Sequence, residues 1–180
     1  MAIDWTSELA AQLTWHWEHH VRTRLEGLSD DEYFWEPVEG CWNIRRSEGG
    51  AMVADFVFPE PVPAPVTTIA WRLGHVIVGV FGMRNASHFG GPPVDYASAV
   101  WPAGADEALA ALDAAYATWT GGVAGLDADR LAAPVGPAEG PYAELPMSAL
   151  VLHIHREAIH HLAEVLLLRD LYRASFAGAR

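Results

Sequence analysis

The chain has 180 residues, of which 51% are hydrophobic, and a formal net charge of −12. This length and composition predict a single folded domain over residues 1–180 and exclude general disorder. Because an acidic surface repels phosphate, we expect neither a nucleic-acid partner nor attachment to an anionic membrane. Cys41 is the only cysteine, which excludes an intramolecular disulfide. With no signal-peptide pattern at the N-terminus, we expect a cytoplasmic protein.

Hydrophobic periodicity predicts four long helices and little strand. The helices are expected at about residues 4–26, 67–89, 105–120 and 146–172. Asp4 is a suitable N-cap for the first helix, and Gly121 and Gly122 are expected to end the third. Pro146 fits the first turn of the last helix.

The segment between the first two long helices is rich in proline and glycine over residues 36–66. Just before it, Ser29 to Glu32 forms a capping box that predicts a short helix. Ala51 to Phe58 is the only candidate strand. The pattern therefore predicts an all-α fold, a four-helix bundle with a long irregular crossover between its first two helices.

The core-facing stripe of the last helix carries titratable side chains where apolar ones are expected. At about 100° per residue, this stripe collects His153, Glu157, His161 and Glu164, with His160 at its edge. A buried carboxylate is costly unless a cation, a metal or a hydrogen-bond donor accompanies it. Glu157 and His161 are four residues apart and therefore neighbours on the helix, so together they can hold one ion.

Other interpretations of these residues stay open. The Glu157/His161 pair fits an ion pair as well as a metal site, and a lone buried histidine such as His75 is more often a core residue. Glu157 and His160 match the Glu-x-x-His pattern of di-iron bundles, but the chain has no second copy. The competing template is a mononuclear site with three protein ligands and an open position.

Four further histidines have less specific surroundings. His16 and His20, four residues apart in the first helix, are candidates for lining a ligand pocket, for supporting a ligand or for simple core packing. His88 and His155 are expected in solvent or in loops.

Three stretches of the chain carry a family resemblance. They are Trp15 to Pro37 together with Trp42, Thr68 to His75, and Arg156 to Tyr172. In these motifs and their order, the sequence resembles the DinB-like superfamily. It is nearest the actinobacterial branch that includes mycothiol-dependent maleylpyruvate isomerase. The resemblance implies a four-helix bundle with up-down-down-up connectivity.

The resemblance also implies a metal site. In this branch, one ligand is a histidine of the second helix, and the last helix supplies a glutamate and a histidine four residues apart. These positions fall on His75, Glu157 and His161, and one divalent ion, zinc or nickel, is implied. Characterised relatives use a low-molecular-weight thiol such as mycothiol, which a divalent ion ionises into a nucleophile. Cys41 is a poor nucleophile by comparison, since its nearest basic neighbour in sequence is Arg45.

We therefore expect a divalent-metal-dependent enzyme that uses such a thiol, of S-transferase or isomerase-like activity. Its partners are then a small-molecule substrate and the thiol, and a homodimer is the assembly to test. His16 and His20 are expected to reach the same cavity as catalytic residues, since histidine titrates near neutral pH. The alternative is a non-catalytic metal- or small-ligand-binding bundle, in which His16, His20 or His160 closes the coordination sphere.

Overall fold

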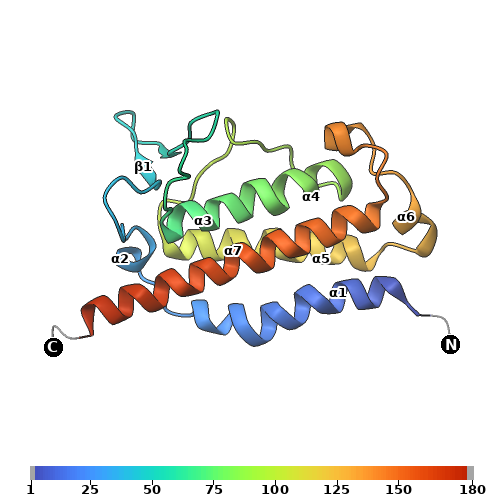
Figure 1. Ribbon diagram of the computed structural model, residues 1–180, viewed down its shortest axis with the longest axis horizontal. Helices are drawn as coiled ribbons and strands as arrows, with labels where there is room; N and C mark the ends of the chain where they lie inside the picture. Colours follow the sequence, from blue (N-terminus) through green and yellow to red (C-terminus); the bar gives the residue numbers. More distant parts are fainter. Residues whose placement is uncertain (1–2, 178–180) are drawn as a thin grey trace.

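The structure is a computed structural model that describes residues 3–177, and it is mostly helical, as predicted. Four long helical segments run along the long axis of the molecule (Figure 1). The first segment is α1 (Trp5–His16), continued by a π-helical turn (Trp17–Val21) and a 3-10 turn (Thr23–Leu25). The second is α3 (Ile69–His75), which a π-helical segment (Val76–Gly82) joins to α4 (Met83–His88). The third is α5 (Ala105–Ala124), and the fourth is α7 (Met147–Phe176).

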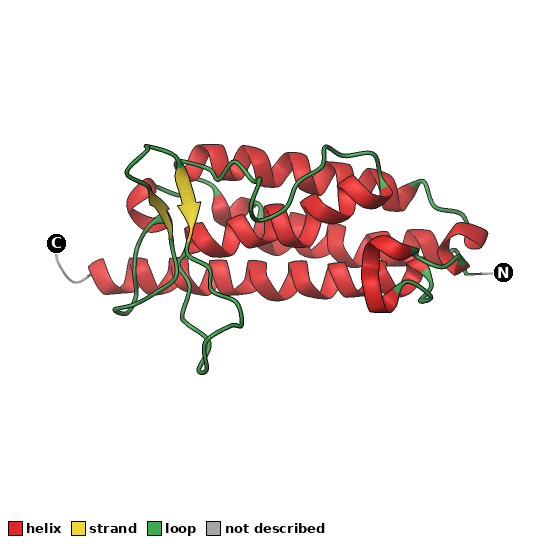
Figure 2. Cartoon of the chain, turned by 90° about the horizontal axis from the view of Figure 1, so that it is seen from above, coloured by secondary structure: helices red, strands yellow, loops and turns green. Residues whose placement is uncertain are grey.

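The long segments bury one common apolar core. Both α1 and the α3–α4 segment pack against α5 and against α7, and the segments lie side by side in both views (Figures 1 and 2). One fully buried leucine from each segment shows how the core is shared: Leu13, Leu73, Leu112 and Leu162. Burying a leucine side chain contributes about 1.5–3 kcal/mol, so this shared core is what fixes α3 against α7.

Side-chain caps define where the helices begin. Asp4 accepts a hydrogen bond from the backbone N–H of Ser7 at 3.2 Å and starts α1. Thr68 caps α3 through the N–H of Trp71, also at 3.2 Å. The capping box of Ser29 and Glu32 is present and starts the short helix α2 (Asp30–Tyr33). Each of these starts follows from the sequence pattern.

Two details of the predicted secondary structure were wrong. Helix α5 does not end at Gly121 but continues to Ala124. Gly122 serves packing instead, because a Cβ there would lie 2.2 Å from the ring of Phe89. The predicted strand exists as β2 (Met52–Ala54), but its antiparallel partner β1 (Ile44–Arg46) has no hydrophobic alternation that would have revealed it.

The connections lie at opposite ends of the molecule. The β1–β2 hairpin and α2 lie near the C-terminal end of α7, whereas α6 (Ala128–Ala132) lies near its beginning (Figure 1). A 3-10 turn (Pro137–Tyr142) follows α6 and leads into α7. Across residues 3–177, no helix combines the length and apolarity that crossing a membrane requires.

Candidate metal centre

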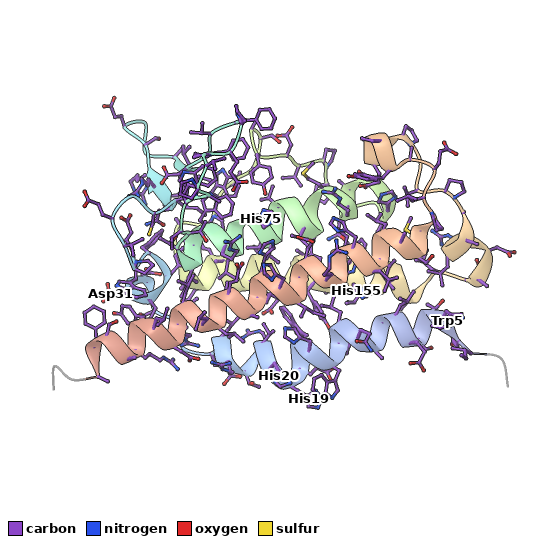
Figure 3. The ribbon with its side chains drawn as sticks, in the orientation of Figure 1. Trp5, His19, His20, Asp31, His75 and His155 are labelled. Atoms are coloured by element: carbon purple, nitrogen blue, oxygen red, sulfur yellow. The ribbon has the colours of Figure 1, made fainter. Side chains whose placement is uncertain are left out.

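The histidine that ends α3 meets the titratable stripe of α7. The imidazole rings of His75 and His161 lie edge to face, with their centroids 4.7 Å apart. On the same helix as His161, Oε2 of Glu157 lies 3.5 Å from its Nε2. Figure 3 shows His75 on the α3 side of α7. Both of the other two predicted ligands therefore lie against His161.

A tyrosine holds the ring of His75 in place. Nδ1 of His75 is 2.5 Å from the hydroxyl of Tyr96, and the imidazole stacks on the indole of Trp71 at 10° between planes. Burial raises the pKa of Tyr96 to about 12, so its phenol stays protonated at neutral pH. When Nδ1–H donates to the phenol oxygen, the lone pair of Nε2 is left for an ion.

A carboxylate performs the same role for His161. Nδ1 of His161 lies 2.8 Å from Oε2 of Glu164, which is one turn further along α7. We assign the proton to Nδ1 because this is its shortest polar contact. Nε2 of His161 then carries the free lone pair, on the side of the ring where Glu157 lies. A histidine oriented by a carboxylate is the usual arrangement of a metal ligand.

Both imidazoles are biased towards their neutral form. Burial, followed by the charges of His161 and Arg72, lowers the pKa of His75 to about 4. Burial also lowers the pKa of His161, although its hydrogen bond to Glu164 opposes the change. A metal binds neutral imidazole, so these two side chains need no deprotonation before they can act as ligands at neutral pH.

A second group of ligand atoms competes for the same ion. Among residues 3–177, the set of three whose ligand atoms all lie within 4.8 Å of one another is His160, His161 and Glu164. The predicted set of His75, Glu157 and His161 does not reach that spacing. The two sets share His161 but lie on different sides of its ring.

An arginine already occupies the side of His161 where Glu164 lies. The guanidinium of Arg72 approaches Oε2 of Glu164 to 3.0 Å and Nδ1 of His161 to 3.3 Å. A metal ion there would be repelled by this fixed positive charge. In addition, the side chain of His160 is 64% exposed. Charge and burial therefore favour an ion on the Nε2 side, between His75, Glu157 and His161.

The predicted catalytic pair, His16 and His20, lies at the end of α1 and in the π-helical turn that follows it. His20 is exposed, and its ring lies 5.8 Å from that of His16 and 4.8 Å from that of Trp15. Figure 3 shows His20 on the α1 side of α7, opposite His75. Among residues 3–177, no hydrogen bond or ring contact joins His16 or His20 to His75, Glu157 or His161, and a catalytic role for them stays a prediction.

The expectation that His88 and His155 lie in solvent or loops was wrong. His155 is 4% exposed and packs edge to face on Trp119 of α5, on a helix that α1 and α3 both cover. The side chain of His88 is 6% exposed, and its Nε2 is 2.9 Å from Oε1 of Glu139. Tyr96 was not among the predicted site residues, because it lies in a loop where no periodicity indicates the direction of its side chain.

The fold is mostly helical, and a histidine–glutamate cluster that could hold a metal ion lies where α3 meets α7. The chain belongs to the DinB superfamily, whose family model matches residues 12–165. The matched range contains His75, Glu157 and His161, together with Tyr96 and Glu164. A search of curated proteins found no match.

Proposed function

We propose that the protein is a divalent-metal-dependent enzyme whose ion is held by His75, Glu157 and His161. The observation that carries the proposal is the meeting of two neutral imidazoles from α3 and α7, each with its Nδ1 engaged and its Nε2 left free. The fold is then the four-helix bundle of this superfamily with up-down-down-up connectivity. The branch that includes mycothiol-dependent maleylpyruvate isomerase is the one that the Glu157 position supports.

The donor set indicates which ion and which chemistry suit the site. Two imidazoles and one carboxylate suit zinc or nickel, and three protein ligands leave a coordination position for a substrate. An ion bound there would supply the Lewis acidity that ionises a low-molecular-weight thiol such as mycothiol. Cys41 does not compete as the nucleophile, since it is 2% exposed and its thiol donates to the carbonyl of Val38.

The ligand set is tested by metal analysis of single variants. We expect His75→Ala and Glu157→Gln to lose most of the bound zinc or nickel, with circular dichroism still that of a helical fold. His160→Ala is the matched control, because His160 neighbours the same centre but belongs only to the competing set. Full metal content in His75→Ala, together with loss in His160→Ala, contradicts the proposal.

Catalysis is tested separately with the metal-loaded protein. The assay follows consumption of mycothiol, and of other small thiols, with a chlorodinitrobenzene- or bimane-type electrophile. We expect turnover above the uncatalysed rate that falls to background in His75→Ala and Glu157→Ala. If the wild-type protein binds metal but stays at background with every thiol, and no thiol binds the ion, the non-catalytic metal-binding bundle is the better account.

A further inference from the structure

A pocket of about 370 Å³ lies between α4, the 3-10 turn that precedes α7, and the first turns of α7. This volume falls within the range of small-molecule sites. Apolar side chains form much of its wall, among them Val135, Leu145 and Leu150. The pocket therefore has room for a small molecule with an apolar body.

The carboxylate in the wall has no oxygen free for a ligand. Oε2 of Glu139 is 3.2 Å from Arg84, and Oε1 is 2.9 Å from Nε2 of His88. The side chain of Glu139 is only 7% exposed. Because both oxygens are engaged, Glu139 offers little to a cation or a donor group of a ligand.

The remaining polar groups of the wall are mainly donors. Arg156 is the most exposed charged side chain of the wall, with 69% of its side chain exposed against 25% for Arg84, and its Nη2 donates to Nδ1 of His153 at 2.6 Å. The phenol of Tyr142 and the imidazole of His153 also line the pocket. In a chain with a net charge of −12, a pocket that presents donors and an unburied guanidinium selects ligands with an acceptor or a negative charge.

The pocket adjoins the metal centre through Glu157. Oε1 of Glu157 is 3.3 Å from Arg156 and 3.6 Å from Nδ1 of His153, both of which line the pocket. Its other oxygen faces His161 at 3.5 Å. A molecule seated in the pocket would thus have one end beside the carboxylate of the centre.

We infer that this pocket binds a small amphipathic carboxylate, with its apolar body against Val135, Leu145 and Leu150 and its carboxylate paired with Arg156. The guanidinium can form a bidentate pair with a carboxylate, which a neutral amide of the same shape cannot match. That this carboxylate is the substrate of the metal centre rests on the proposed function. Binding of the carboxylate itself does not depend on the metal.

The test compares 3-phenylpropanoate with its neutral analogue 3-phenylpropanamide by protein NMR titration, in metal-free and zinc-loaded protein. We expect the acid to bind about tenfold more tightly than the amide, with shifts centred on the start of α7. Arg156→Gln should remove this preference. Arg130→Gln is the matched control, because Arg130 is exposed on α6 and does not line the pocket. Ala149→Leu, which fills the pocket without changing charge, should weaken both probes.

Equal affinity for acid and amide, or binding of neither at millimolar concentration, overturns the inference. So does an equal loss in Arg156→Gln and Arg130→Gln, because the effect would then come from overall charge. Zinc titration of the same samples reports on the proposed function alone. A protein that prefers the acid but binds no zinc supports the pocket and contradicts the metal centre. A protein that binds zinc but does not prefer the acid supports the metal centre and contradicts the pocket.

Discussion

The rings of His75 and His161 meet at 86° with 4.7 Å between their centroids, and each has its Nδ1 held by a different partner. Tyr96 holds the first ring from a loop, and Glu164 holds the second from the next turn of α7. The pair is therefore oriented by residues outside the predicted ligand set. Weakening either partner should loosen the centre without removing a ligand.

Tyr96→Phe removes only the hydroxyl that orients His75. We expect the affinity for zinc to fall about tenfold, the lower end of what loss of such a partner costs. Stability should change little, because the ring that stacks on Phe56 is retained. Competition titration with a chelating dye measures the effect. An unchanged affinity would show that the Tyr96 contact does not position a ligand.

Glu164→Gln distinguishes an orienting residue from a ligand. Where Glu164 only accepts the proton of His161, the amide oxygen still accepts it, and zinc affinity should fall no more than about 10–100-fold. The same competition titration measures this. Complete loss of zinc binding in Glu164→Gln, with Glu157→Gln still binding, would favour the competing set of His160, His161 and Glu164.

Gly79 is the glycine that makes room for the tyrosine. A Cβ at this position would lie 2.3 Å from the hydroxyl of Tyr96 and 3.2 Å from Nδ1 of His75. Gly79→Ala should therefore displace Tyr96, lower the melting temperature and weaken zinc binding, although alanine is the better helix former. The matched control is Gly121→Ala in α5, where a Cβ meets nothing within 4 Å. There the substitution should stabilise by roughly 0.5–1 kcal/mol.

A buried ion pair at the opposite end of α7 governs acid stability. The side chains of Glu32 and Arg169 are 6% and 2% exposed, with 3.2 Å between Oε1 and Nε. Burial alone would raise the pKa of Glu32, but hydrogen bonds from Arg169 and Ser29 and the arginine charge outweigh it and lower the pKa. The ionised form thus stabilises the fold above the ordinary pKa, and this contribution is lost as pH falls through the lowered value.

Glu32→Gln should cost about 3–5 kcal/mol at neutral pH, because Arg169 is left buried without its counter-charge. It should also flatten the loss of stability on acidification, measured by urea unfolding from about pH 7 to about pH 3. Glu18→Gln, at an exposed position, should follow the wild-type curve. Parallel pH curves for wild type and Glu32→Gln would contradict this assignment.

The helices follow from the sequence because local chemistry determines them. Asp4, Thr68 and the Ser29–Glu32 box start helices where side-chain oxygens can accept backbone N–H groups. The predicted end of α5 was wrong because of a contact with a residue distant in the sequence. In the sequence, Gly122 resembles a helix terminator. In the structure, a Cβ at this position would clash with the ring of Phe89, which follows α4.

Of the candidate site, only the relative placement of residues on one helix could be predicted, because helical spacing determines it. The spacing of Glu157 and His161 places them on one side of α7, whereas the partner of His75 depends on where a loop carries Tyr96. His155 shows the same limit: the sequence does not reveal that α7 is covered on two sides. His16 and His20 share a face of the first helix, but periodicity alone does not say which neighbour that face meets.

Crystals of the zinc-loaded protein, measured on both sides of the zinc absorption edge, would show which side chains hold the ion. We expect one anomalous peak at about 2.0–2.2 Å from Nε2 of His75, Nε2 of His161 and a carboxylate oxygen of Glu157, with one coordination position left open. A peak bound instead by His160 and Glu164, or no peak within reach of His75, would contradict it.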